Sequence, residues 1–154
     1  MTELLFHSRR VSLYGGRVNG FKIDEVNLYE QLGLELIVKL SRCFYSKVYA
    51  DPNPEFRSMF PADMEGAIRN QYEFFVQRLG GPPLYSSRKG HPALRPRHAR
   101  FPITRENVER WLGYMRQAMV EVGIPDDARA RLDEFFTASG SFLQNIDEHG
   151  RRIY

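Results

Sequence analysis

The sequence predicts an all-α fold, and three observations support this. Apolar residues recur at steps of three and four along long stretches, as they do on one face of a helix. No stretch sustains the period-two alternation that is typical of a half-buried strand. Glycine and proline gather between the periodic stretches, where helices must end. The length of 154 residues suits one domain, and a hydrophobic share of 42% excludes wholesale disorder.

The first helical pattern begins near Asp24. Its apolar row consists of Leu28, Leu32, Leu36, Leu40, Phe44 and Val48. Gly33 is expected to separate a short helix from a longer one over about residues 34–49. The prolines at positions 52 and 54 end the longer helix, because proline lacks the backbone donor. A short apolar turn with Phe56 and Phe60 follows.

The second helix is predicted over about residues 62–79, where two adjacent rows are apolar, and Gly80-Gly81-Pro82-Pro83 ends it. Residues 80–103 contain three glycines and five prolines, so at most one short turn of helix is expected there, near residues 92–98. A loop of this length in a compact domain usually has a function.

Two further helices complete the predicted fold. Thr104 is expected to cap the first of them, whose apolar stripe continues to residue 122. Gly123-Ile124-Pro125 breaks that helix. Asp126 or Asp127 starts the last helix, which extends to about residue 146.

The chain is expected to comprise an N-terminal extension over residues 1–24, flexible or loosely docked, a helical domain over residues 25–147 and a C-terminal tail over residues 148–154. Because the extension carries arginines and serines, a transit peptide is the alternative. No run approaches the roughly 18 uninterrupted apolar residues of a membrane span, so no membrane partner is expected. The single cysteine, Cys43, excludes an intramolecular disulfide and suits a reducing compartment, which predicts a cytoplasmic location.

His98 is the candidate metal ligand among the four histidines. No two histidines have the i, i+3 or i+4 spacing of a helical metal site, so a site with several histidines is not expected. One imidazole suffices to hold haem iron and leaves the opposite face open for a gas. Its second ring nitrogen should then donate to a nearby carbonyl or carboxylate. The alternative interpretation is a loop histidine on a basic surface.

Three polar side chains fall among apolar helical positions: Tyr45, Gln71 and Trp111. Each carries a donor that suits a bound oxygen atom, namely a phenol O–H, an amide N–H or an indole N–H. A buried donor without a partner costs about 1–3 kcal/mol, so these groups need one another, the backbone or a ligand. Ordinary core packing is the alternative.

One long string of residues carries a family resemblance. Residues 70–86 read NQYEFFVQRLGGPPLYS, and Arg88-Lys89-Gly90-His91-Pro92-Ala93-Leu94, Arg97-His98 and Phe101-Pro102-Ile103 follow. With Phe44-Tyr45 ahead of it and Glu109-Arg110-Trp111-Leu112 after it, the string resembles the group II truncated, two-over-two haemoglobins, and most of all their plant-type members. The resemblance covers about residues 24–146. It implies a globin-like two-over-two helical sandwich with a long Gly/Pro loop before the proximal histidine.

The resemblance also implies a haem b cofactor and a role for each site residue. His98 corresponds to the proximal iron ligand and Arg97 to a propionate partner. Tyr45, Gln71 and Trp111 correspond to the distal donors. The remaining expected haem contacts are Phe60, Ala67, Phe74, Phe75, Leu79, Tyr85, Phe101 and Met115. Many bacterial members carry a tyrosine where this chain has Phe60, so the hydrogen-bond network is expected to depend on the three distal donors.

These assignments imply a protein that binds O2, NO and CO reversibly at a five-coordinate iron and releases O2 slowly, because up to three donors hold the gas. Such a protein suits sensing or chemistry with NO, O2 or nitrite better than bulk oxygen transport. Nitric oxide dioxygenation, nitrite reduction and peroxidase-like turnover each need an external reductant, which is unknown. The protein is expected as a monomer or a homodimer without a nucleic-acid partner.

A second function class remains open on the residues alone. The arginines at positions 95, 97, 100 and 105 could bind nucleic acid or an acidic partner as part of a non-haem basic helical module. They lie in a loop without a recognition helix behind them, which weakens that interpretation. The net charge of +3 is also too small to indicate a nucleic-acid partner by itself.

Overall fold

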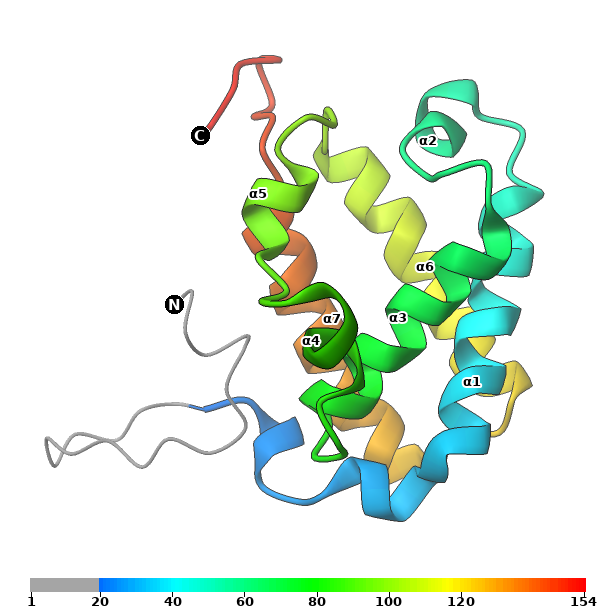
Figure 1. Cartoon of the computed structure of the whole chain (residues 1–154). Helices are drawn as coiled ribbons and strands as arrows, with labels where there is room; N and C mark the ends of the chain where they lie inside the picture. The colour runs from blue at the N-terminus through cyan, green and yellow to red at the C-terminus, as the bar shows by residue number, and fades with distance from the viewer. Residues whose placement is uncertain (1–19) are drawn as a thin grey trace, which may run out of the picture.

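The computed structural model describes residues 20–154, and within that range the regular elements are helices (Figure 1). The elements are η2 (Lys22–Asp24), α1 (Leu28–Tyr49), α2 (Pro54–Ser58), α3 (Met64–Arg78), α4 (Leu84–Lys89), α5 (Leu94–His98), α6 (Arg105–Glu121) and α7 (Asp126–Leu143). An isolated β-bridge joins Ile146 and Arg152. The predicted all-α class is therefore confirmed. None of the described helices is long and apolar enough to cross a bilayer.

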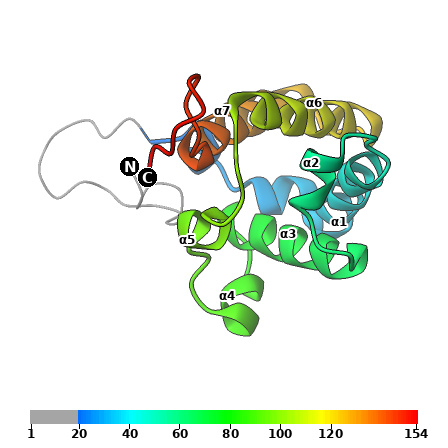
Figure 2. The same ribbon diagram turned by 90° about the horizontal axis from the view of Figure 1, so that it is seen from above.

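The four long helices form two packed pairs. Helix α1 packs on α3, α6 packs on α7, and contacts between α1 and α6 join the pairs. Seen from above, α6 and α7 form one layer and α1 and α3 the other (Figure 2). All four helices contribute to the core, whose largest fully buried side chains include Ile37, Leu40, Phe44, Ile68, Met115, Met119, Leu132 and Phe135.

Helix α1 is interrupted where the sequence predicted it. Gly33 has φ 80° and ψ 161°, outside the helical region, so two helical segments meet there at a kink. A side-chain cap begins α6 as expected, since Thr104 accepts from the Asn107 amide. Asn27 caps α1 in the same way by accepting from the Glu30 amide, and this cap was not predicted. The last helix begins at Asp126, one of the two predicted positions.

The segment between α3 and α6 holds two short helices, whereas the sequence predicted at most one. Helix α5 matches the predicted turn near residues 92–98, but α4 was missed, and the prediction is wrong there. Its N-cap, Pro83, lies where a proline is tolerated, since the first amides of a helix need no intrahelical partner. Contacts from α3 hold α4: the Gln77 amide donates to the Ser86 hydroxyl (2.7 Å) and Glu73 accepts from Arg88 (2.8 Å).

The described residues that precede α1 are docked on the domain. Ile23 is buried within η2, and Asp24 accepts two hydrogen bonds from the Arg78 guanidinium at the end of α3, the shorter at 2.6 Å. The Arg78 guanidinium also lies 5.1 Å from the centroid of the Phe135 ring. The extension was expected to be flexible or loosely docked over residues 1–24; residues 1–19 of it lie outside the described residues.

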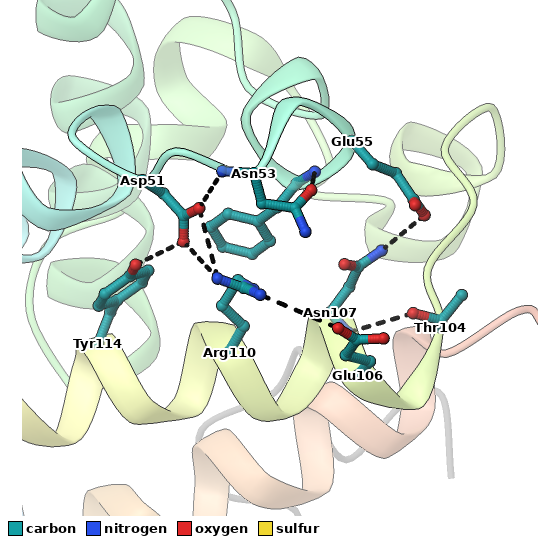
Figure 3. Close-up of polar contacts among 9 residues, drawn as sticks. Asp51, Asn53, Glu55, Thr104, Glu106, Asn107, Arg110 and Tyr114 are labelled. Atoms are coloured by element: carbon teal, nitrogen blue, oxygen red, sulfur yellow. Dashed lines mark hydrogen bonds and ion pairs between the residues drawn. The ribbon is translucent and has the colours of Figure 1, made fainter.

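A buried ion pair fixes the end of α1 against α6 (Figure 3). Asp51 accepts from the Asn53 amide (2.7 Å), from the Arg110 guanidinium (3.0 Å) and from the Tyr114 hydroxyl. The Asp51 side chain is fully buried. Burial alone would raise the pKa of Asp51, but the hydrogen bonds from Tyr114, Asn53 and Arg110 outweigh it and hold the pKa below its usual value. The carboxylate is therefore charged at neutral pH.

Replacing Asp51 tests this ion pair. Because the pKa of Asp51 is lower in the folded than in the unfolded chain, its stabilisation is complete above the unfolded pKa of about 3.9 and is lost as pH falls through the folded pKa. Asp51→Asn is therefore expected to lower the free energy of unfolding at pH 7 by about 1–3 kcal/mol, with a smaller difference below pH 4. Urea unfolding at both pH values measures this. Glu106→Gln, at the exposed end of the same network, is the control and should change little; equal losses in the two variants would contradict the assignment.

Two glycines with open space around them should respond oppositely to a methyl group. An added Cβ meets no atom within 4 Å at either Gly33 or Gly113, so backbone conformation decides the outcome. Gly33→Ala forces a side chain into a region that only glycine adopts readily and should cost about 1–3 kcal/mol. Gly113→Ala lies within α6 and should stabilise by about 0.5–1 kcal/mol. Thermal unfolding of both variants checks the signs.

Candidate functional site

His98 is the last residue of α5 and is oriented by a backbone hydrogen bond. Its Nδ1 lies 2.6 Å from the Leu94 carbonyl oxygen, one turn earlier in the same helix. A carbonyl only accepts, so Nδ1 carries the proton and Nε2 keeps a free lone pair. The partner expected for the second ring nitrogen is thus confirmed, and the tautomer is the one that a metal ligand needs.

The surroundings of His98 favour its neutral form. Burial lowers the pKa of His98, and the positive charges of Arg100 and Arg97 lower it further, while the hydrogen bond to Leu94 opposes them. The net effect is a pKa below the usual value for histidine. The imidazole is therefore uncharged at neutral pH, as metal coordination requires.

The three predicted donors come from three of the four long helices. Tyr45 is buried on α1, Gln71 is partly buried on α3, and Trp111 is partly buried on α6. The Phe44 ring joins two of them, since its centroid lies 4.9 Å from that of Tyr45 and 4.9 Å from that of Trp111. Contacts of α1 with both α3 and α6 bring the three helices together.

These donors lack the partners that an ordinary core would give them. Neither the Gln71 Nε2, the Tyr45 hydroxyl nor the Trp111 indole N–H bonds to any residue in the 20–154 range, and the Gln71 Oε1 acceptor is buried without a partner as well. Burial raises the pKa of Tyr45, with a smaller contribution from Tyr49, so the phenol stays protonated and able to donate. An unsatisfied buried group costs about 1–3 kcal/mol, which favours a ligand as the missing partner.

Aromatic rings continue from these donors toward the segment that leads to His98. Successive contacts, with centroids 4.9–6.2 Å apart, join Phe60, Tyr45, Phe44, Trp111, Phe136, Phe75, Phe74 and Tyr85. Five of the predicted site aromatics thus lie in one connected series with the ring of Trp111. Sequence reasoning missed Phe44 and Phe136 because both fall within regular apolar rows, where a core residue and a site residue give the same signal.

The other predicted contacts are more dispersed. Ala67 lies one turn before Gln71 on α3 and is buried, and Met115 is fully buried on α6. The Phe101 carbonyl accepts from the Asn145 side chain. Leu79 lies beside Ile23, Asn27 and Gly80 and lines a surface cleft of about 290 Å³. Their roles as haem contacts stay predictions.

The four arginines around His98 contact different neighbours. Arg95 lies over the Phe142 ring (3.9 Å), Arg100 over the Phe101 ring (4.8 Å), and Arg105 pairs with Glu109. Arg97 is exposed, lies over the Tyr85 ring (5.6 Å), and uses only Nη2 to bond the Lys89 and His91 carbonyls. Its remaining guanidinium donors are suited to a carboxylate at the edge of the aromatic series.

The residues present fit a haem. One neutral imidazole offers a free nitrogen, aromatic rings provide apolar walls, and an arginine with spare donors suits a propionate. Helix α5, which carries His98, and helix α1, which carries Tyr45, lie on opposite sides of the molecule in both views (Figures 1 and 2). This arrangement suits a ligand that is contacted from two sides. In the part of the chain that the structure describes, no three His, Cys, Asp or Glu side chains gather into a set that could hold a bare ion.

Comparison with known proteins identifies the family. Residues 27–143 match the model of the bacterial-like globins. The chain is 49% identical over 129 residues to two-on-two hemoglobin-3 of Arabidopsis thaliana, a match that covers 82% of this chain and 74% of the relative. It is 50% identical over 127 residues to group 2 truncated hemoglobin 3-1 of Lotus japonicus, covering 81% and 76%.

A solved structure agrees with these matches. The truncated oxygen-avid haemoglobin of Bacillus subtilis superposes with a TM-score of 0.73 at 38% identity, covering 78% of this chain and all of that one. The predicted two-over-two helical sandwich is thereby confirmed. The chain belongs to the bacterial-like globin family, as a group II truncated, two-on-two haemoglobin.

Proposed function

We propose that this protein holds haem b through His98, binds O2, NO and CO reversibly, and releases O2 slowly. The observation that carries the proposal is the set of donors on α1, α3 and α6, namely the Tyr45 hydroxyl, the Gln71 Nε2 and the Trp111 indole N–H, which make no hydrogen bond among the described residues. Family membership supports the coarser part of the proposal, which is gas binding by a globin.

The proximal residues are arranged to hold the cofactor. The hydrogen bond from Nδ1 to Leu94 directs Nε2 of His98 away from its own helix, and the neutral ring can coordinate at physiological pH. Arg97, through Nε and Nη1, would pair with a propionate. Haem b would supply an iron centre that coordinates diatomic gases reversibly.

The side of the site opposite His98 would hold a gas by hydrogen bonds. Tyr45, Gln71 and Trp111 each offer a donor to a molecule that carries partial negative charge, and such charge-assisted bonds are about twice as strong as neutral ones. Ala67 is too small to coordinate a metal or to close this face. Phe60 packs against the Tyr45 ring at 6.1 Å and contributes no donor.

Slow release favours a function other than bulk transport. The similar Bacillus subtilis protein is described as oxygen-avid, which supports retention of O2 in this chain. Tight retention of O2 suits sensing, or reaction of the bound O2 with NO. Reduction of nitrite is a second candidate reaction. Each turnover of this kind consumes electrons, so a separate reductant would have to supply them.

Replacing the proposed iron ligand tests the cofactor assignment. Wild-type protein mixed with hemin should become red, and after reduction it should form a CO complex with a sharp absorption band. His98→Ala should lose most of the pigment, while His149→Ala, an exposed histidine near the C-terminus, should keep it. A colourless wild type would contradict the proposal and favour the basic binding module. So would a His98→Ala variant that keeps its haem and its CO complex.

Removing single donors tests the proposed hydrogen bonds to bound O2. Trp111→Phe and Gln71→Leu should each raise the O2 dissociation rate roughly tenfold, since a hydrogen bond to a charged acceptor contributes about 1.5–3 kcal/mol. Stopped-flow displacement of O2 by CO measures this rate. Gln117→Leu makes the same change at an exposed position of α6 and should leave the rate unchanged. Unchanged rates in both site variants would refute the hydrogen-bond network.

A further inference from the structure

The chain beyond α7 turns back and binds the segment that directly follows His98. Asn145 is fully buried, and its side chain bonds this segment twice: Oδ1 accepts from the Ile103 amide (2.8 Å), and Nδ2 donates to the Phe101 carbonyl (2.8 Å). The backbone amides of Asn145 and Ile146 both donate to the Ile103 carbonyl, at 3.0 and 3.2 Å. A single buried amide side chain therefore fixes residues 101–103 against the end of α7.

The residues after Asn145 form a small hairpin that brings a second group to the same segment. The bridge between Ile146 and Arg152 closes the hairpin, and the Ile153 amide donates to the Asn145 carbonyl (2.9 Å). Arg152 then donates from Nη1 to the carbonyl of Ala99 (2.7 Å), the residue next to His98. The segment between α5 and α6 is thus held at Ala99 and again at Phe101 and Ile103.

The same region also holds α5 itself. The Arg95 Nε donates to the Phe142 carbonyl (3.0 Å), and its guanidinium lies over the Phe142 ring (3.9 Å) and over the Tyr154 ring (4.5 Å). Tyr154 is in turn fixed by a hydrogen bond from its hydroxyl to the Leu143 carbonyl (2.9 Å). Figure 1 shows α5 beside the end of α7 and the C-terminal segment.

Helix α5 depends on these outside contacts because it has little stability of its own. It contains five residues, none of them fully buried, with Leu94 packed against the core, and its N-cap, Ala93, has a left-handed φ of 46° and no side-chain cap. A helix this short does not persist in isolation. What fixes the direction of the His98 ring is therefore the contacts that reach α5 and residues 99–103 from elsewhere.

We propose that residues 144–154, named here the C-terminal clasp, set the position of the iron ligand. Asn145, Arg152 and Arg95 act as positioning residues: they hold the backbone on both sides of His98, and the hydrogen bond to Leu94 transmits that position to the imidazole. The proposal rests on the proposed role of His98 as haem ligand.

Four variants test the clasp. Asn145→Ala removes both side-chain hydrogen bonds, and Asn145→Asp keeps the acceptor for the Ile103 amide while losing the donor to Phe101. Arg152→Ala removes an exposed side chain, so folding should survive, and Arg152→Lys retains a donor for Ala99. The control is Arg116→Ala, which removes the same charge from an exposed pair with Asp133 on α6 and α7.

Two readouts distinguish positioning from general stability. In the haem-free protein, hydrogen exchange at the Ile103 amide should accelerate in Asn145→Ala. In the haem-loaded ferrous protein, Asn145→Ala and Arg152→Ala should broaden and shift the iron–histidine stretching band in resonance Raman spectra. They should also release haem roughly 10–100-fold faster, the usual effect of losing a group that orients a metal ligand. Arg152→Lys should restore most of the wild-type behaviour, with Asn145→Asp intermediate.

The outcomes separate the two proposals. A wild-type protein that takes up no haem, or a His98→Ala variant that keeps it, refutes the proposed function and the clasp with it. A haem-loaded protein in which Asn145→Ala and Arg152→Ala leave the stretching band and the haem release unchanged refutes the clasp alone. Equal effects in Arg116→Ala also refute it, because they would reflect general destabilisation.

Discussion

The site depends on one constraint: its histidine lies on a helix too short to hold itself. None of the five residues of α5 is fully buried, and Leu94 is the one that packs against the core, so packing fixes this helix less than it fixes α3 or α6. Hydrogen bonds add to that packing. The Leu94 carbonyl sets the tautomer and the direction of the His98 ring, and bonds from beyond α7 hold the backbone around it. Such an arrangement fixes direction through a few short bonds while the surrounding segment stays free of regular structure.

The Tyr45 side of the site is built in the opposite manner. Its donors stand on long helices in the packed core, and the buried Asp51 ion pair locks the end of α1 to α6. Placement matters here because the donors of Tyr45, Gln71 and Trp111 make no hydrogen bond to the described residues around them. A more mobile core would let them turn to one another or to backbone carbonyls. Under the proposed function, the packing of the two helical pairs would keep the donors available for a bound gas.

Sequence reasoning predicted the long helices well, because each has an apolar row with a recognisable end. Gly33, Thr104 and Asp126 all proved to be boundaries of the kind expected. It missed α4, since α4 is held by Glu73 and Gln77 of α3, and such long-range partners leave no local pattern.

The site was predictable in part. The three donors stood out, because a polar group on an apolar face is unusual, whereas His98 was assigned through the family resemblance. The binding of residues 99–103 by Asn145 and Arg152 was not predictable. Asn145 is one amide residue in a stretch without periodicity, and its partners are backbone groups more than 40 positions away. No sequence pattern encodes contacts of that kind.

The ion pair between Asp24 and Arg78 bears on where this globin physically begins. The match to the family model starts at residue 27, after the aspartate, whereas the Arg78 side chain that bonds it is almost fully buried. A shortened chain cut at the family boundary would lose the Asp24 carboxylate and with it a buried ion pair of the Arg78 guanidinium, and breaking a buried pair is costly in a region of low dielectric constant. The family match therefore begins at residue 27, whereas the ion pair extends the folding unit to Asp24. An expression fragment should include Asp24.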